Sequence, residues 1–329
     1  MSIHLQEEHY TRLKNRKTAR LEFYTDVVSG LTASPKALKS KYFYDAEGDA
    51  LFQRIMQCPE YYLTDCELEI LSHQTDAIAS AIQASTDAFN VVELGPGDAS
   101  KSSYLLKELL NRDVDYTYMP IDISHNVLSL LQTTLPEQLP GLRMQGFEGD
   151  YLEMLKETEQ KGRRRLVMFM GSSIGNVPPQ GAVAFCRELY NHLLPGDVML
   201  IGFDLKKNPM VILDAYNDSQ GITRAFNLNL LKRINRELGG DFNLDHFAHY
   251  PTYDPHTGSC KSYLVSRRQQ QVHIGPNAIR FAEGEPVFME ISQKYSLEEI
   301  DNLAVESGFV PLQHFVDSKR WFVDVLWQR

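Results

Sequence analysis

The stretch that most constrains the fold is NVVELGPGDASKSS, from Asn90 to Ser103. Its pair of β-branched valines ends in an acid, Glu93, and the glycine turn GPG leads through a polar bend into a helical run that starts at Tyr104. A strand, a tight turn and a helix in this order form the first unit of a doubly wound nucleotide-type fold. Glycines let a ligand approach the backbone, and the start of the helix offers N–H groups without intrahelical partners. We therefore predict a cofactor site at this turn.

Strand and helix signals then alternate regularly up to about residue 205. The second to fifth strands are predicted over Tyr116–Ile123, Leu142–Phe147, Leu166–Met170 and Val198–Phe203. The fourth strand is apolar throughout, which is typical of a parallel strand covered on both faces. The chain is thus predicted to be an α/β protein built on a parallel sheet.

Two acids that follow predicted strands are candidate cofactor ligands. Asp122 ends the second strand, where an acid commonly binds the ribose hydroxyls of an adenosine cofactor. Asp122 or Ser124 could instead cap the next helix, but the position relative to the glycine turn favours the ligand role. Asp150, which precedes Tyr151, could accept a hydrogen bond from an adenine amino group or cap the helix Leu152–Thr158, and the sequence leaves these two alternatives open.

The C-terminal segment narrows the choice of cofactor. A helix over Leu297–Gly308 and a hairpin of strands at Val310–Phe315 and Trp321–Trp327 are predicted to complete the sheet. A closing hairpin suits the seven-stranded, Rossmann-like sheet of class I methyltransferases better than the all-parallel sheet of a dehydrogenase. The glycine turn also lacks the third glycine of the dinucleotide fingerprint, because Ser100 stands there. We therefore predict that the turn holds S-adenosylmethionine.

A rival interpretation rests on GSSIG, Gly171–Gly175, which matches the G-x-S-x-G nucleophile elbow of serine hydrolases and follows a strand. An elbow serine should lead at once into a helix, whereas Asn176, Val177 and two prolines intervene here. No His-Gly-Gly stretch supplies a second oxyanion donor. None of the possible bases has a distinctive setting; they are His246, His249, His256, His273 and His314. The methyltransferase interpretation is favoured over a hydrolase that uses Ser173.

Composition excludes several classes of partner. The formal net charge of −10, with Lys and Arg scattered, argues against a nucleic-acid substrate, because phosphate binding needs clustered cations. No apolar run approaches the roughly 20 residues of a membrane span, and the polar N-terminus lacks a signal-peptide core. The four cysteines show neither metal-ligand spacing nor a disulfide framework. We expect reduced thiols, no metal, and a cytoplasmic monomer.

The segments outside the regular alternation are predicted to form a second lobe. The first 60 residues carry a helix over Arg20–Leu31 and several tyrosines, which serve either as a hydrophobic seam or as an aromatic cage for a cation. A long helix over Thr64–Ile82, with Thr64 as its candidate cap, leads into the sheet. Residues 206–290 carry two helix signals and then two strand-like runs, at His249–Tyr253 and Lys261–Arg267.

Eight segments in a fixed order resemble one known family, the histidine-specific, S-adenosylmethionine-dependent Nα-methyltransferases of ergothioneine biosynthesis. They are KYFYDAEGDALFQRI, PEYYLTDCELEIL, VVELGPGDASKSSYLL, YMPIDIS, FMGSSIGN, DLKKNP, AYNDSQGITRAFNLNLLKRINRELGGDFNLDHF and MEISQKY. Together they are highly specific and cover nearly the whole chain from about residue 30. The block from Ala215 to Phe247 is the most diagnostic.

The resemblance implies two domains and a stepwise transfer of methyl groups to the α-amine of L-histidine, up to the trimethylated betaine. The methyltransferase domain would comprise residues 64–205 and 295–329, and the substrate domain residues 1–63 and 206–294. The family's cofactor contacts correspond here to Tyr44, Gly95, Lys101, Asp122, Asp150 and Tyr151. The amine and carboxylate of the amino acid would meet Tyr61, Asn176 and Tyr216, and the imidazole would meet Glu290 and Ser292.

These residue types fit the expected chemistry. Methyl transfer is an in-line displacement on a sulfonium, so the enzyme's task is largely positioning. The amine must arrive unprotonated, and an Asn carbonyl and Tyr hydroxyls can orient it without a countercharge that favours the ammonium form. Tyrosine faces can accommodate the growing methylammonium. For Tyr44 and Tyr61 the resemblance therefore favours a role in the active site over a role in hydrophobic packing. Glu290 lies in the apolar run VFMEI, where burying a carboxylate is costly unless it is paired or hydrogen-bonded.

One departure from the family concerns the imidazole pocket. Ser262 stands where the family has a methionine, which leaves the identity of the acceptor amino acid open. Relatives in the wider family methylate indole amino acids, so the same reaction on another amino acid is the alternative within the class. Glu290 favours imidazole, because indole offers one N–H and no acceptor.

Overall fold

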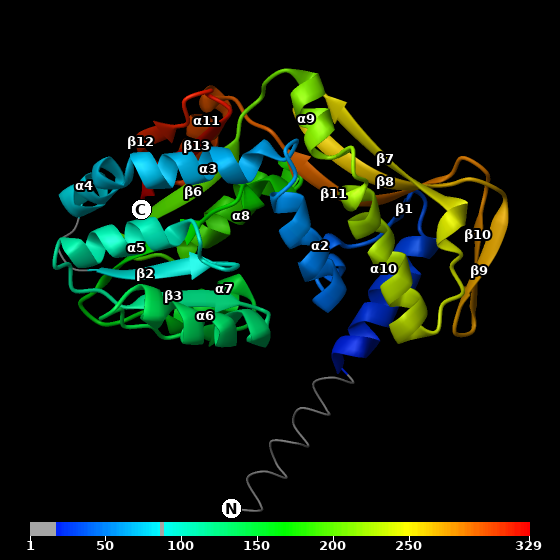
Figure 1. Cartoon of the computed structure of the whole chain (residues 1–329), viewed down its shortest axis with the longest axis horizontal. Coiled ribbons are helices and arrows are strands. Elements are labelled where there is room, and N and C mark those ends of the chain that lie inside the picture. The colour runs from blue at the N-terminus through cyan, green and yellow to red at the C-terminus, as the bar shows by residue number, and fades with distance from the viewer. Residues whose placement is uncertain (1–17, 86–88) are drawn as a thin grey trace, which may run out of the picture. The chain divides into compact units, whose positions relative to one another are not determined.

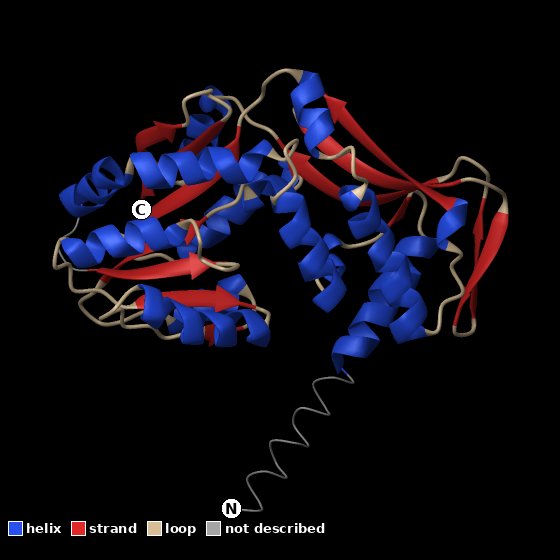
Figure 2. Cartoon of the chain, viewed as in Figure 1, coloured by secondary structure: helices blue, strands red, loops and turns tan. Residues whose placement is uncertain are grey.

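The computed structural model describes residues 18–85 and 89–329. The prediction that the polar N-terminus lacks a signal-peptide core therefore concerns residues outside the described ones. The chain divides into two compact units. Unit 1 comprises the residues up to Tyr61 together with Asn208–Ile291, and unit 2 comprises Tyr62–Lys207 and Ser292–Arg329. In the described part of the chain, no helix is both long and apolar enough to cross a membrane. Figure 1 labels the elements of both units, and Figure 2 colours them by type.

Unit 2 is built on a seven-stranded sheet in the order β12-β13-β6-β5-β2-β3-β4. The central strands pair in parallel, and β13 runs antiparallel to both β6 and β12. This is the Rossmann-like α/β sheet with a closing hairpin that the sequence predicts. The strands are β2 (Phe89–Leu94), β3 (Tyr118–Asp122), β4 (Phe147–Glu148), β5 (Arg164–Phe169), β6 (Val198–Asp204), β12 (Val310–Val316) and β13 (Phe322–Gln328).

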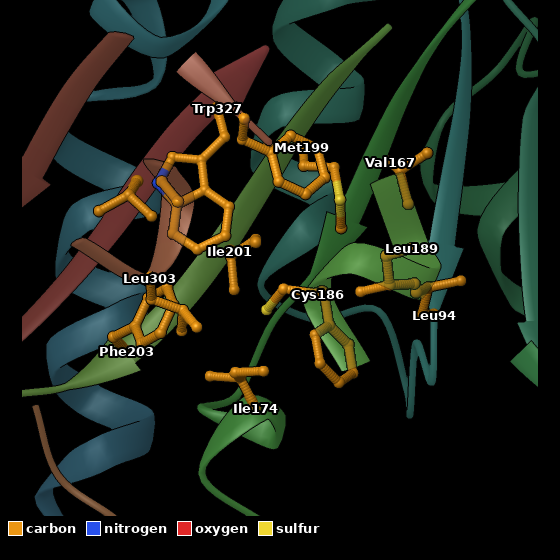
Figure 3. Packing of buried hydrophobic residues seen from close by; sticks show 14 of the residues in the cluster. Leu94, Val167, Ile174, Cys186, Leu189, Met199, Ile201, Phe203, Leu303 and Trp327 are labelled. Atoms are coloured by element: carbon orange, nitrogen blue, oxygen red, sulfur yellow. The ribbon is translucent and has the colours of Figure 1, made fainter. Parts of the chain in front are cut away.

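Helices cover both faces of this sheet. The apolar core on one face lies against α8 and α11, where Cys186 and Leu303 pack with Phe203 and Trp327 of the strands (Figure 3). α3 and α5 pack with each other and α3 contacts β13, and the alternation of side chains along β6 places this layer on the other face. The helices are α3 (Tyr62–His73), α4 (Thr75–Ser85), α5 (Ser102–Asn111), α6 (His125–Gln138), α7 (Tyr151–Glu157), α8 (Pro179–Asn191) and α11 (Leu297–Ser307), with the 3-10 turn η2 (Ser173–Asn176).

Unit 1 combines helices with a four-stranded sheet, in the order β1-β11-β8-β7, and a separate hairpin of β9 and β10. Its core includes Phe226 and Leu230 of α10 and Leu264 and Met289 of the sheet. Its first described segment is a helix over residues 18–32. The other elements are β1 (Lys36–Ala37), η1 (Ser40–Phe43), α2 (Ala46–Met56), α9 (Pro209–Ala215), α10 (Ile222–Leu238), η3 (Leu244–His246), β7 (Phe247–Asp254), β8 (Ser259–Ser266), β9 (Gln270–Ile274), β10 (Asn277–Phe281) and β11 (Pro286–Gln293).

Two local predictions were wrong. The predicted helix Thr64–Ile82 is two helices, α3 and α4, and α3 begins at Tyr62, so Thr64 is not its cap. The break falls at Gln74, whose side-chain amide donates to the carbonyl of Val316 at 2.8 Å, a tertiary contact that no local pattern encodes. The third strand is much shorter than Leu142–Phe147, because only β4 and one isolated bridge pair with β3.

Candidate active site

The glycine turn after β2 has the conformation that the sequence predicts. Gly95 and Gly97 have φ angles of 67° and 57°, a region that favours glycine. A Cβ on Gly95 would lie 2.6 Å from the hydroxyl of Tyr151, and nothing lies within 4 Å of the corresponding position on Gly97. The Gly95 N–H donates to the carbonyl of Ile121 at 2.9 Å. The turn is therefore held against β3 and Tyr151, with one open glycine toward which a ligand can approach.

The two candidate acids beside this turn both accept backbone hydrogen bonds. Asp122 accepts the N–H of Ser124 at 2.7 Å, and Ser124 itself caps α6. Asp150 accepts the N–H of Leu152 at 2.9 Å and caps α7, which is one of the two alternatives that the sequence left open. Burial raises the pKa of Tyr151 to about 12, with further contributions from Asp122 and Asp150. The structure thus brings these three predicted residues to one place at the ends of β3 and β4.

Lys101 belongs to what we term the acid-rich cluster, which consists of Glu67, Glu93, Asp324 and Lys101. Glu67, on α3, is fully buried and pairs with the Lys101 ammonium through Oε2. Its Oε1 accepts the N–H of Gly171, at the end of β5, at 2.6 Å. Burial lowers the pKa of Lys101, but the charge of Glu67 outweighs burial and leaves it above its usual value. Glu67 therefore fixes both the predicted cofactor lysine and the loop after β5.

Burial shifts the pKa values of the other two acids of the cluster upward. Burial raises the pKa of Glu93 to about 7, against the opposing hydrogen bonds from Tyr118 and Ser102. Burial and the charge of Glu67 raise the pKa of Asp324 well above its usual value. Neither carboxyl oxygen of Asp324 has a hydrogen-bond partner among the described residues. Protonation of Glu93 and Asp324 therefore offsets negative charge that the single ammonium of Lys101 cannot neutralise.

A second buried group, the lysine-rich cluster, consists of Asp204, Lys207 and Lys294. Asp204 ends β6 and is fully buried. Its Oδ2 pairs with the ammonium of Lys294 at 2.6 Å, and its Oδ1 pairs with that of Lys207. The hydroxyl of Tyr62 donates to the same carboxylate at 2.9 Å. Burial alone would raise the pKa of Asp204, but the two lysines hold it below its usual value.

Two of the residues expected to bind histidine lie in unit 2, beside this second cluster. Asn176 ends η2, and the preceding Gly175 packs so closely that a Cβ there would lie 2.9 Å from the carbonyl oxygen of Gln293. Ser292, the neighbour of Gln293, accepts a hydrogen bond from Lys294 at 2.8 Å. The loop that carries Asn176 and the segment that carries Ser292 are thus in backbone contact.

The aromatic residues expected at the site lie in unit 1. The rings of Tyr61 and Tyr216 meet edge to face, with centroids 6.3 Å apart. The ring of Tyr44 lies 5.8 Å from those of both Phe52 and Phe226, and its side chain stays 42% exposed. Tyr61 and Tyr216 are therefore brought together, and Phe52, whose ring centroid also lies 6.5 Å from that of Tyr61, connects them to Tyr44.

Ser262 and Glu290 are not brought together. Ser262 is buried in β8 on the face of Leu264, and its hydroxyl has no hydrogen-bond partner in the described chain. Glu290 follows the buried Met289, and alternation along β11 sends it to the opposite face. The rings of Tyr263 in β8 and Phe288 in β11 are in contact, so they lie on the same face of the sheet. Glu290 shares that face with Phe288, whereas Ser262 lies on the face opposite to Tyr263. The structure therefore separates Ser262 from the side chain with which the resemblance groups it.

The hydrolase interpretation finds no support at Ser173. Its hydroxyl donates to the carbonyl of Met170 at 2.8 Å, and in the described chain it bonds to no histidine. The left-handed φ of 57° falls on Ser172, one residue too early for the elbow. Burial lowers the pKa of His249 to about 4, and its Nε2 is buried without a partner among the described residues, a more distinctive setting than the sequence suggested.

Sequence reasoning missed Glu67, Asp204, Asp324 and Lys294, all of which are buried. The sequence contained one signal of the acid-rich cluster. Gly202 interrupts an apolar strand, and a glycine inside a strand often marks the close approach of another group. A Cβ at Gly202 would clash with Oε1 of Glu67 and approach Oδ1 of Asp324 to 3.1 Å. The described residues include no group of His, Cys, Asp and Glu that could hold a metal ion, and all four cysteines are buried free thiols.

Comparison with known proteins decides the family. The family described as histidine-specific, S-adenosylmethionine-dependent methyltransferase matches residues 23–329. The chain belongs to this family. It is 37% identical over 285 residues to the histidine N-alpha-methyltransferase of Mycolicibacterium smegmatis, a match that covers 86% of this chain and 87% of the relative. The protein of the same name from Mycobacterium tuberculosis is 35% identical, over 89% and 90% of the two chains.

A third relative is larger. Ergothioneine biosynthesis protein 1 of Neurospora crassa is 31% identical over 283 residues, which make up 83% of this chain and 31% of the relative. The chain is thus an S-adenosylmethionine-dependent methyltransferase, and the α/β fold and the cofactor predicted from the sequence are confirmed. In unit 2 the glycine turn is open at Gly97, and the Lys101 ammonium, paired with Glu67, follows this turn.

Proposed function

We propose that this methyltransferase transfers methyl groups from S-adenosylmethionine to the α-amine of L-histidine, stepwise up to the trimethylated product. The observation that supports the proposal most strongly is the match of residues 23–329 to a family described as histidine-specific. Two relatives that are 37% and 35% identical to the chain over the aligned residues are named histidine N-alpha-methyltransferases. The third relative's name further supports a place in ergothioneine biosynthesis.

We assign the cofactor to unit 2. The backbone at Gly95 and Gly97 would receive the amino-acid end of the cofactor, and the Lys101 ammonium would pair with its carboxylate. Asp122 would accept the ribose hydroxyls, and Asp150 and Tyr151 would border the adenine. Tyr44 is the remaining residue of the proposed set. When bound, S-adenosylmethionine supplies an electrophilic methyl on a sulfonium, and the remaining task of the protein is to position the acceptor.

The proposed roles at the acceptor follow from protonation. An ammonium has no lone pair, so the amine must be neutral when it attacks. The side-chain carbonyl of Asn176 and the hydroxyls of Tyr61 and Tyr216 orient the amine and carboxylate without placing a full negative charge beside the nitrogen. We assign the imidazole to Glu290 and Ser292, which lie on the same face of β11 by alternation. Ser262 is not assigned a contact, because it lies on the other face.

The domain roles are proposed on the same basis. Residues 64–205 and 295–329 would form the cofactor-binding domain, and residues 1–63 and 206–294 the substrate-binding domain. The acceptor is a small amino acid. That the enzyme is a monomer, works in the cytoplasm and needs neither nucleic acid nor a membrane stays a prediction, which light scattering, fractionation of cells and binding assays would test.

Incubation with each amino acid and S-adenosylmethionine, followed by mass spectrometry, tests the proposed function. L-Histidine should gain one, two and three methyl groups in succession, while tryptophan and tyrosine should gain none at a comparable rate. A preference for tryptophan would instead establish the alternative acceptor.

The assigned residues make a second test. Glu290→Ala should raise the KM for histidine far more than the Kd for S-adenosylmethionine, and Asn176→Ala should lower kcat. Equal effects of Glu290→Ala on both ligands would refute the assignment of the imidazole.

A further inference from the structure

Glu67 joins two parts of unit 2 that the proposed function assigns to different ligands. Its side chain is fully buried on α3, and each of its carboxylate oxygens has its own partner. Oε2 pairs with the ammonium of Lys101, which follows the glycine turn, and Oε1 accepts the N–H of Gly171 at 2.6 Å. A Cβ built on Gly171 would lie 3.8 Å from Nζ of Lys101, so the two partners of Glu67 are also neighbours of each other.

Gly171 begins the loop that presents Asn176. The next residue, Ser172, is buried; its hydroxyl accepts the N–H of Asp204 at 3.2 Å, and its carbonyl accepts the N–H of Gly175 at 2.9 Å. Gly175 is closely packed, since a Cβ there would lie 2.9 Å from a carbonyl oxygen of β11. The short segment from Gly171 to Asn176 is therefore held by consecutive contacts, and a displacement at its start is passed on to its end.

The ammonium of Lys101 links this loop to the cofactor. The side chain of Lys101 is 21% exposed, whereas that of Glu67 is buried, so a carboxylate from outside the protein can reach the cation. An ammonium has three N–H donors and can pair with Glu67 and a second carboxylate at once. A cation shared between two carboxylates neutralises each of them less, and Glu67 then accepts more strongly from Gly171. Pairing of Lys101 with the cofactor therefore tightens the loop that carries Asn176.

We propose that Glu67 is a positioning residue that couples the two ligands: through Lys101 it responds to the cofactor, and through Gly171 it fixes Asn176 for the acceptor amine. This inference rests on the proposed function, because the roles of Lys101 and Asn176 come from it. It adds that the two ligands raise each other's affinity, reciprocally, and that one buried carboxylate carries the effect.

Calorimetric titration of histidine, with and without saturating S-adenosylhomocysteine, measures this coupling without turnover. In the wild type the Kd for histidine should fall about fivefold or more when S-adenosylhomocysteine is bound, and histidine should lower the Kd for S-adenosylhomocysteine by the same factor. Glu67→Gln keeps an acceptor for Gly171 but removes the charge that responds to Lys101, so both factors should drop to within about twofold of one. Independent binding in the wild type, or undiminished coupling in Glu67→Gln, would overturn the proposal.

Asp324→Asn is the matched control. Asp324 is a second fully buried acid of the acid-rich cluster, and it accepts no hydrogen bond in the part of the chain that the structure describes. The variant leaves both contacts of Glu67 in place, so the coupling factor should stay within about twofold of that of the wild type. Loss of coupling in both variants would mean that the cluster as a whole, and not Glu67, carries the effect, which would contradict the proposal.

The contact between Glu67 and the loop can be broken by itself. A Cβ at Gly202 in β6 would clash with Oε1 of Glu67, the atom that accepts from Gly171, while Oε2 keeps Lys101 as its partner. Gly202→Ala should therefore raise the KM for histidine about tenfold and leave the Kd for S-adenosylhomocysteine within about twofold. A general loss of structure would affect both ligands, so equal increases in the two constants would refute the role of the loop contact.

A double-mutant comparison shows whether Gly202→Ala acts through Glu67. In a Glu67→Ala background, Gly202→Ala should raise the KM for histidine no further, because the oxygen that it displaces is already gone. A further increase of the same size as in the wild-type background would mean that the added methyl acts by another route, against the proposal. Should Gly202→Ala not fold, the coupling factors of Glu67→Gln and Asp324→Asn decide the question.

The same titrations separate this inference from the proposed function. If the wild type methylates histidine and the coupling persists in Glu67→Gln, only the inference fails. If the wild type neither binds nor methylates histidine, the proposed function fails and the inference with it.

Discussion

The α3-covered face of the unit 2 sheet carries two buried charge clusters of opposite composition. The acid-rich cluster has three carboxylates for one ammonium, Lys101. The lysine-rich cluster has two ammonium groups for one carboxylate, Asp204. α3 reaches both, because Tyr62 in its first turn binds Asp204 and Glu67 binds Lys101.

The difference shows two ways of balancing buried charge. In the acid-rich cluster the pKa values of Glu93 and Asp324 rise, so protons replace the missing cations. In the lysine-rich cluster the pKa of Asp204 stays low, and burial together with the charge of Lys294 lowers the pKa of Lys207 despite the attraction of Asp204. The first cluster holds the predicted cofactor lysine, and the second holds the proposed substrate serine.

The largest expected effect comes from removing the single cation of the acid-rich cluster. Lys101→Met leaves Glu67 buried without its ion-pair partner, and we expect a loss of about 4 kcal/mol in the free energy of unfolding. Lys207→Met should cost about 1 kcal/mol, because Lys294 and Tyr62 still neutralise and bind Asp204. Urea unfolding at pH 7 measures both values, and a cost at Lys207 as large as that at Lys101 would erase the distinction between the clusters.

The pH dependence of stability tests the protonation of Glu93. Its pKa of about 7 in the folded protein lies above the ordinary value of 4.5, so the folded protein holds this proton more tightly. The stabilisation is therefore complete below pH 4.5 and is lost as the pH rises to 7, by about 3 kcal/mol. Glu93→Gln cannot titrate, so the difference in unfolding free energy between wild type and variant should change by that amount over this range. A constant difference would show that Glu93 is ionised throughout.

Much of the fold of unit 2 could be predicted because its signals are local. The apolar strands, the glycine turn and the caps of α6 and α11 are encoded in short stretches of sequence, and Ser296 and Glu299 form the capping box at which helix α11 begins. The break at Gln74 could not be predicted, since it depends on a contact with Val316, some 240 residues along the chain.

The candidate site shows the same limit. Asn176, Lys101 and the glycine turn were found because they stand beside predicted strands or within family motifs. The two clusters were not found, because Glu67, Asp204 and Asp324 come from segments far apart in the sequence and only the folded sheet brings them to their lysines. The face on which Ser262 lies also needed the register of the strands.

A smaller effect is expected at Glu67. Glu67→Gln keeps an acceptor for the N–H of Gly171 but removes the charge that holds Lys101. The lysine should then be less well positioned, and the Kd for S-adenosylmethionine should rise about tenfold, equivalent to about 1.4 kcal/mol. Calorimetric titration gives this value, with Asp204→Asn as the control that leaves the acid-rich cluster intact. An unchanged Kd in Glu67→Gln would mean that Glu67 does not contribute to cofactor binding.

The smallest effect is expected at Asp324. Its carboxyl already favours the neutral form, so Asp324→Asn should change the free energy of unfolding at pH 7 by about 1 kcal/mol or less. Asp204→Asn removes an ionised partner of two lysines and should cost about 3 kcal/mol. Thermal unfolding of the pair gives the comparison, and equal losses would mean that Asp324 is ionised in the folded protein.

The central claim is that the chain methylates the α-amine of L-histidine. Fragmentation mass spectrometry of a reaction with L-histidine and S-adenosylmethionine, in which the methyl groups are isotopically labelled, tests it most directly. The account predicts that up to three labelled methyl groups appear on the α-nitrogen and none on the ring. Label on an imidazole nitrogen, or label found only when another amino acid replaces histidine, would contradict it.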